Sequence, residues 1–156
     1  MSALLDTAID LINIPSTADK PEELHRIIAY VHDFFRASPG LIVRTYLHHE
    51  KPAIVISTVD TLAPDLLMMG HLDVVPASPA LFTPQIVDGR LIGRGACDMK
   101  SENAVMMHVL RSIAATQHPP NVALMLTTDE EIGGMDGARH LVEDIGYRCR
   151  VALVPD

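Results

Sequence analysis

Apolar residues follow a helical period in the first part of the chain. Between residues 4 and 12 they recur every three or four positions, and Pro15 follows shortly afterwards. The same period returns after Pro21. The apolar stripe of this second segment consists of Leu24, Ile27, Ile28, Val31 and Phe34 or Phe35. Because a period of about 3.6 residues places such positions on one face of a helix, the pattern predicts two amphipathic helices.

Short apolar runs replace the helical period after residue 40. Residues 41–47 and 53–59 are rich in β-branched side chains and are joined by a polar link, which predicts two consecutive strands. Residues 66–70 and 122–126 are almost wholly apolar, and such runs are typical of strands that are buried on both faces of a sheet. Residues 151–154 predict a last strand.

A hairpin and two more helices complete the predicted elements. Residues 86–92 contain an Asp-Gly turn between short apolar segments, which predicts a hairpin. Residues 98–116 and 137–145 are predicted helices. The expected inward face of the first consists of Val105, Met106, Val109, Leu110 and Ile113. Alternating helices and buried strands indicate the α/β class, with a mixed, largely parallel sheet flanked by helices on both sides.

The composition narrows the class of partner. The chain has 20 acidic against 12 basic residues, so it lacks the basic surface that a nucleic acid would require. No apolar segment approaches the roughly 20 residues of a membrane span, and the N-terminus does not have the pattern of a signal peptide. The only cysteines are Cys97 and Cys149, far apart in the sequence. We therefore expect a soluble cytoplasmic protein with neither nucleic acid nor membrane as a partner.

Acidic residues and a histidine follow several of the apolar runs. These residues are His71, Asp73, Asp98, Glu130, Glu131 and Asp156. Ligands bind beyond the carboxyl ends of strands in such sheets, and imidazole and carboxylate groups bind divalent metals. Taken singly, each residue has a common structural explanation, such as a helix cap at Asp98 or an exposed acidic loop at Glu130 and Glu131. Together they make a metal site the first hypothesis.

Three longer segments carry a family resemblance. Residues 70–76 (GHLDVVP), 88–100 (DGRLIGRGACDMK) and 127–133 (TTDEEIG) closely resemble three signatures of the M20 family of zinc-dependent aminoacylases and peptidases. The signatures occur in the family's order and approximate spacing, and the resemblance extends over roughly residues 1–156. It implies a zinc-peptidase-like catalytic domain, of which this chain would be an incomplete part.

The resemblance implies a site for two zinc ions. His71 would bind the first ion, Asp98 would bridge the two ions, Glu131 would bind the second and Asp156 would complete the protein ligands of the first. Members of the family often have a cis peptide bond just after the bridging aspartate. Oxygen and nitrogen ligands are also compatible with Co²⁺ or Mn²⁺. Cys97 lies beside Asp98, and we expect it to pack rather than to bind metal.

The same resemblance implies hydrolysis of an amide bond. Two ions roughly 3.5–4 Å apart can share a water and lower its pKa, giving a metal-bound hydroxide. Glu130 would be the general base, and Asp73 would hold the imidazole of His71. The expected substrate, and thus the expected partner, is a small N-acylated amino acid or peptide.

The chain departs from the family pattern in several respects. The aspartate motif continues as residues 100–103 (KSEN) where the family commonly has Lys-Gly-Gly. The chain also stops at Asp156, before the lid domain that often mediates dimerisation and before the C-terminal catalytic segment with its last histidine. We therefore expect residues 1–156 to be the N-terminal portion of the catalytic domain in a truncated form that lacks part of the active site, and we expect the full-length form to be a homodimer.

Two other functions remain open from the sequence. The first is a non-catalytic metal-binding or interaction module. The second is a nucleotide-binding domain built on residues 93–95 (GRG), but this segment lacks a third glycine at Asp98 and follows a hairpin rather than a buried strand. The remaining histidines are expected to be surface or helix-face residues: His25, His32, His48, His49, His108, His118 and His140.

Overall fold

The computed structural model describes residues 2–156. Its helices are α1 (Ala3–Ile12), α2 (Pro21–Arg36), α3 (Lys100–Ala114) and α4 (His140–Glu143). Its strands are β1 (Ile42–His48), β2 (Lys51–Ser57), β3 (Leu66–His71), β4 (Gln85–Val87), β5 (Arg90–Ile92), β6 (Val122–Thr127) and β7 (Val151–Leu153). Single turns of 3₁₀-helix cover Pro79–Phe82 and Glu130–Ile132, and a π-helical turn over Met135–Arg139 leads into α4. Every predicted element is present, with bounds shifted by a few residues.

The main sheet is mixed, as predicted. Its strand order is β1-β2-β6-β3-β7. β1 pairs antiparallel with β2 and β2 antiparallel with β6, whereas β3 pairs parallel with both β6 and β7. The strands β3, β6 and β7 therefore run in one direction, and their carboxyl ends lie at one edge of the sheet. His71 and Thr127 are register partners at this edge.

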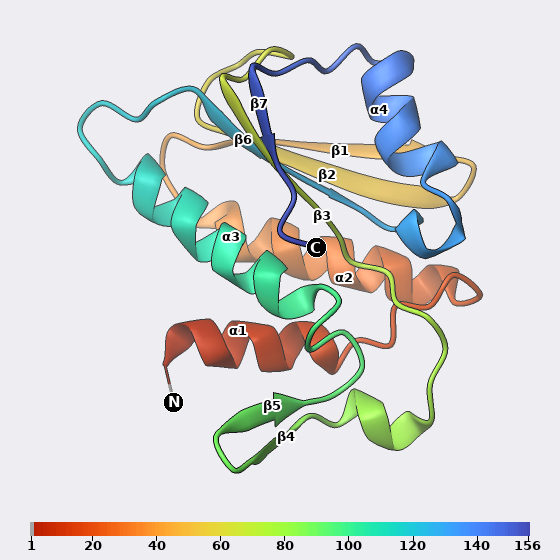
Figure 1. Ribbon diagram of the computed structural model, residues 1–156. Coiled ribbons are helices and arrows are strands. Elements are labelled where there is room, and N and C mark those ends of the chain that lie inside the picture. Colours follow the sequence, from red (N-terminus) through yellow and green to blue (C-terminus); the bar gives the residue numbers. More distant parts are fainter. Residues whose placement is uncertain (1) are drawn as a thin grey trace.

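Helices cover both faces of the sheet. α1, α2 and α3 lie together on one side and α4 lies on the other (Figure 1). The larger core lies on the first side and includes the predicted stripe of α2, in which Leu24, Ile27, Ile28, Val31 and Phe35 are buried. The smaller core on the second side contains Leu141 and Tyr147. Among the described residues, no helix combines the length and apolar character needed to cross a bilayer.

The inward face of α3 matches the prediction only in part. Met106 and Leu110 are buried as predicted, but Val105 and Val109 are 46% and 41% exposed, and Met107 is fully buried in their place. The buried face also includes the polar side chain of Asn103 in the first turn. Since Asn103, Met107 and Leu110 lie at i, i+4 and i+7, the face is continuous along the helix. The hydrophobic pattern misplaced part of this face because Asn103 is polar.

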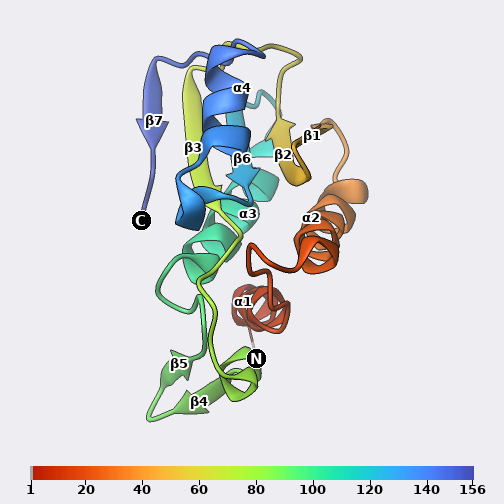
Figure 2. The ribbon, with the colours of Figure 1, turned by 90° about the vertical axis from the view of Figure 1, so that its right-hand side faces the viewer.

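The predicted hairpin is formed by β4 and β5. It projects away from the main sheet, beyond α1 (Figures 1 and 2). Asp88 and Gly89 form its turn with φ values of 50° and 76°. Positive φ at both central residues is the conformation that Asp-Gly favours in two-residue turns.

Candidate metal centre

Side chains from three separate segments meet at the carboxyl edge of the sheet. His71 is the last residue of β3, Asp98 lies two residues before the start of α3, and Asp156 follows β7. The Nε2 atom of His71 lies 2.9 Å from Oδ1 of Asp98 and 4.0 Å from Oδ1 of Asp156. All three potential ligand atoms lie within 4.8 Å of one another. One imidazole nitrogen and two carboxylate oxygens are a donor set that suits zinc.

The surroundings of His71 fix which ring nitrogen is available. Its Nδ1 lies 3.0 Å from the backbone carbonyl oxygen of Asp73 and 3.5 Å from that residue's carboxylate. A carbonyl oxygen can only accept, so Nδ1 carries the proton and donates. Nε2, which faces Asp98, is the nitrogen left for an ion.

The protonation of His71 reflects the same contacts. Burial lowers the pKa of this imidazole, but its hydrogen bonds to Asp73, the negative charge of Asp73 and its hydrogen bond to Asp98 outweigh burial and raise its pKa to about 9. The ring is therefore an imidazolium near neutral pH when no cation is bound. A divalent ion would take the place of the Nε2 proton.

Asp73 connects the imidazole to the loop that follows β6. Its side chain is fully buried. Oδ1 accepts a hydrogen bond from the backbone N–H of Glu130 at 3.2 Å, and Oδ2 accepts one from the backbone N–H of Glu131 at 3.0 Å. One carboxylate thus contacts His71 and also fixes the backbone of both glutamates.

The two glutamates differ in their surroundings. The side chain of Glu130 is exposed at the edge of the sheet. Oε1 of Glu131 accepts a hydrogen bond from the backbone N–H of Val75 at 3.2 Å. Burial, followed by the nearby negative charge of Asp98, raises the pKa of Glu131. Glu131 therefore lies beside Asp98 but outside the three-residue group of His71, Asp98 and Asp156.

The peptide bond between Asp98 and Met99 is cis, as the family resemblance implies. Met99 is fully buried, whereas the side chain of Asp98 is 58% exposed. Cys97 is exposed, so the expectation that it packs is wrong, and it does not belong to the group of His71, Asp98 and Asp156.

Asn103 of α3 holds the backbone of His71, and the sequence did not identify this residue. Its Nδ2 donates to the backbone carbonyl of His71 at 2.5 Å. This approach favours a glycine at position 70, because a Cβ there would collide with Oδ1 of Asn103. The sequence offers only a weak indication of this role. Asn103 is a polar residue at helical spacing from the apolar stripe of α3, and its function becomes apparent only from the fold.

Lys100 is a second buried polar residue that the sequence did not single out. Its side chain is fully buried, and Nζ donates to the backbone carbonyls of Leu11 and Ile14 at 3.0 Å and 2.7 Å. Burial lowers the pKa of Lys100 to about 7, against the opposing effect of the negative charge on Asp73. Lys100 thus joins the end of α1 to the segment that bears Asp98.

Comparison with known proteins agrees with this geometry. Residues 67–154 match the profile described as Peptidase family M20/M25/M40. The chain belongs to this family. Among the curated relatives of this M20 chain is succinyl-diaminopimelate desuccinylase of Xylella fastidiosa (strain M23), which is 35% identical over 156 residues. That match covers 95% of this chain and 40% of the relative, so the chain spans about two fifths of the length of the relative.

A second relative matches a shorter region more closely. Succinyl-diaminopimelate desuccinylase of Xanthomonas campestris pv. campestris (strain B100) is 44% identical over 87 residues, which cover 51% of the M20 chain and 23% of the relative.

Solved structures show the same fold. An M20 family metallo-carboxypeptidase, Sso-CP2 from Sulfolobus solfataricus, superposes with a TM-score of 0.83 at 20% identity and covers 99% of this chain and 37% of its own. Human carnosine dipeptidase 1 superposes with a TM-score of 0.80 at 23% identity and covers 98% of this chain and 38% of its own. These similarities support the mixed α/β fold of the M20 chain.

Proposed function

We propose that this M20 chain carries part of the metal centre of a hydrolase that cleaves amide bonds in N-acylated amino acids or small peptides. The proposal rests on one observation, which is the group formed by His71, Asp98 and Asp156 at the carboxyl edge of the sheet. Membership of a metallopeptidase family supports the same chemistry.

In this proposal the ligands are divided between two ions. His71, Asp98 and Asp156 would hold a first ion, and Glu131 together with Asp98 would hold a second. Zinc is the proposed metal, and Co²⁺ or Mn²⁺ would also suit nitrogen and oxygen ligands. When bound, such ions polarise a carbonyl group and lower the pKa of water.

The remaining steps belong to side chains of the chain. Asp73 keeps the proton of His71 on Nδ1, which leaves Nε2 to act as a ligand. The carboxylate of Glu130 accepts the proton of the attacking water, and then donates it to the nitrogen of the departing amine. The exposure of the Glu130 side chain, together with the hydrogen bond that holds its backbone to Asp73, supports this role.

The substrate class follows from the relatives. Both curated relatives described above are desuccinylases by name, which favours an N-acylated amine over a long peptide. Because the chain spans only about 40% of the first of these relatives, the complete active site, homodimer formation and the assignment of residues 1–156 to the N-terminal portion of the catalytic domain are part of the proposal. Cytoplasmic localisation likewise stays a prediction.

The decisive experiment compares Glu130→Gln with the unchanged full-length protein. We expect kcat for N-succinyl and N-acetyl amino acids to fall by roughly 10²–10⁴, because a general base is lost. Metal content, measured by elemental analysis, should stay the same. Glu22→Gln is the matched control, since Glu22 is an exposed residue at the start of α2. Undiminished turnover in Glu130→Gln would remove this residue from the mechanism.

The alternative function, a non-catalytic metal-binding or interaction module, predicts a different result. It predicts that the full-length protein binds metal but does not hydrolyse any of the N-acyl amino acids or dipeptides offered. Metal-dependent turnover of one of these substrates would exclude it.

A further inference from the structure

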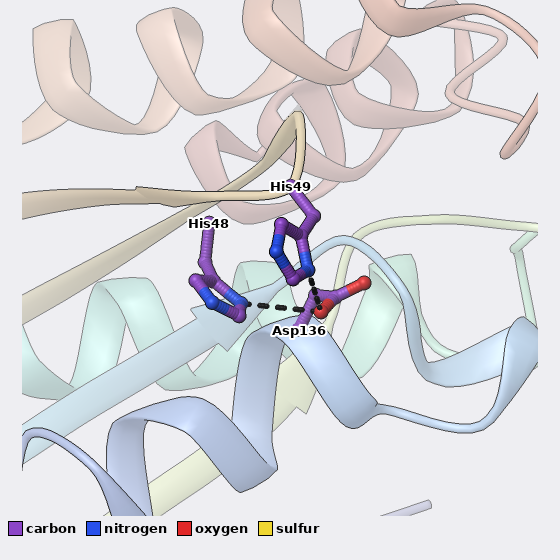
Figure 3. Close-up of side chains that lie close together, drawn as sticks. All are labelled: His48, His49 and Asp136. Carbon is purple, nitrogen blue, oxygen red and sulfur yellow. Dashed lines mark hydrogen bonds and ion pairs between the residues drawn. The ribbon is translucent and has the colours of Figure 1, made fainter.

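A second group of metal-binding side chains lies at the turn between β1 and β2. Nδ1 of His48 and Nδ1 of His49 lie 3.1 Å and 2.9 Å from the same oxygen, Oδ1 of Asp136. The three atoms lie within 4.8 Å of one another. Figure 3 shows the two rings side by side, with the carboxylate facing both of them. His48 and Asp136 are about 30% exposed and His49 is 74% exposed, so the group is open to ions from solvent.

The backbone of the turn is unusual. His49 and Glu50 have φ values of 42° and 63°, so two consecutive non-glycine residues are left-handed. A two-residue turn of this kind ordinarily has Asn-Gly or Asp-Gly at these positions. Non-glycine residues in this region are often found where a ligand is held. The conformation brings the rings of two adjacent residues, which would otherwise point to opposite faces of a strand, to one oxygen atom.

A third ring packs against this turn. The ring of His140 stacks on the ring of His48 at 4.0 Å and an interplanar angle of 3°, and the ring of His49 lies 3.9 Å from that of His48 at an angle of 34°. These contacts place the ring of His48 against two neighbouring rings while its Nδ1 faces Asp136.

The backbone that bears the Asp136 carboxylate is held in place by Asp129. The backbone N–H groups of Asp136 and Gly137 donate to Oδ2 of the buried Asp129 at 2.8 Å and 2.9 Å. Neighbouring ligand atoms of tetrahedral zinc are about 3.3 Å apart, as follows from metal–ligand distances of 2.0–2.1 Å. The observed separations of 3.1 Å and 2.9 Å would need to widen by only a few tenths of an ångström.

We propose that His48 Nδ1, His49 Nδ1 and Asp136 Oδ1 bind one divalent transition-metal ion with a preference for imidazole, of which Zn²⁺ is the model. This site is separate from the centre at His71. The turn between β1 and β2 lies two to three strand positions away from β3. At a strand spacing of about 4.8 Å this is roughly 10–15 Å, which is too far for one ion to be shared.

The test measures zinc binding by the full-length protein after removal of metal. We compare the unchanged protein with His49→Ala, Asp136→Asn and the control His25→Ala, which alters an exposed histidine of α2. Bound zinc is determined by elemental analysis after equilibrium dialysis against buffered free Zn²⁺. The proposal expects one ion per chain fewer in His49→Ala and Asp136→Asn than in the unchanged protein, and no change in His25→Ala. Equal zinc content in all four proteins would overturn it.

A second measurement separates a lost ligand from a lost fold. Nitrogen-15 and carbon-13 imidazole resonances of His48 and His49 should shift on addition of Zn²⁺ to the unchanged protein. Glu130→Gln should show the same shifts, so the turn site can fail or succeed independently of the proposed hydrolase function. If zinc moves the resonances of His71 but leaves those of His48 and His49 in place, the proposal is wrong.

Discussion

The backbone N–H of Glu131 donates to Oδ2 of Asp73 at 3.0 Å, and the same carboxylate contacts the ring of His71. A single buried side chain therefore links His71 on β3, a proposed metal ligand, to the loop after β6. This arrangement makes Asp73 a positioning residue, because it acts on the proposed ions only through His71 and the glutamate loop.

Replacing this carboxylate should weaken metal binding without unfolding the protein. In Asp73→Asn the amide has nearly the same shape but no negative charge, so Nδ1 of His71 loses its charged partner. We expect the metal affinity of the centre to fall roughly 10–100-fold. Competition with a chromophoric chelator measures the affinity, and circular dichroism checks the fold. An unchanged affinity would show that the backbone carbonyl alone orients the ring.

Metal affinity should also depend on pH through His71. The pKa of its imidazole is raised to about 9 in the metal-free protein, so below that pH an ion must displace a proton. Affinity should therefore rise by about tenfold per pH unit toward pH 9 and level off above it. Calorimetric titration in two buffers with different ionisation enthalpies should detect about one proton released per ion at pH 7.5. A flat profile between pH 7 and pH 9 would contradict the raised pKa.

The close approach of Asn103 to β3 predicts a cost for any side chain at position 70. Gly70→Ala places a Cβ against Oδ1 of Asn103 and should lower the free energy of unfolding by about 1–3 kcal/mol. Chemical denaturation of Gly70→Ala, Asn103→Ala and the double variant measures this. The double variant should lose less than the sum of the single losses, because the two residues are in contact. Additive losses would indicate that the strain lies elsewhere.

Lys100 gives a second prediction about stability. Lys100→Met keeps the length of the side chain but leaves the carbonyls of Leu11 and Ile14 without their donor, which should lower the free energy of unfolding by about 1–3 kcal/mol. The pKa of Lys100 is lowered to about 7 from 10.5, so the unfolded chain binds one more proton between these values. Chemical denaturation should therefore show that the free energy of unfolding of the original protein increases from pH 7 to pH 10 relative to that of Lys100→Met.

Much of the architecture was accessible from the sequence because apolar periods are local. The stripe of α2 and the apolar run of β6 each identify their element and its buried positions without knowledge of any partner. The family motifs likewise singled out His71 and Asp98, which the fold brings together. α3 was misread because Asn103 and Lys100 are polar but buried, and their carbonyl partners lie far away in the sequence.

The proposed metal site at His48, His49 and Asp136 could not be predicted from the sequence, because its residues are brought together only by the fold. His48 and His49 are adjacent, and adjacent residues of a strand point to opposite sides, so the sequence favoured surface positions for both. Only the left-handed turn and the distant Asp136 give these rings a common partner. Neither can be deduced from local composition.

The backbone N–H groups of Asp136 and Gly137 donate to the side chain of Asp129 and so connect the two ends of the segment 129–137. Glu130 is the second residue of this segment. A cation bound by Asp136 at the turn would therefore also restrain the backbone of the segment that bears Glu130 and Glu131. Coupling between two binding sites is reciprocal. If a cation at the turn between β1 and β2 raises the metal affinity of the group at the carboxyl edge of the sheet, metal at that edge must raise the affinity of the turn by the same factor.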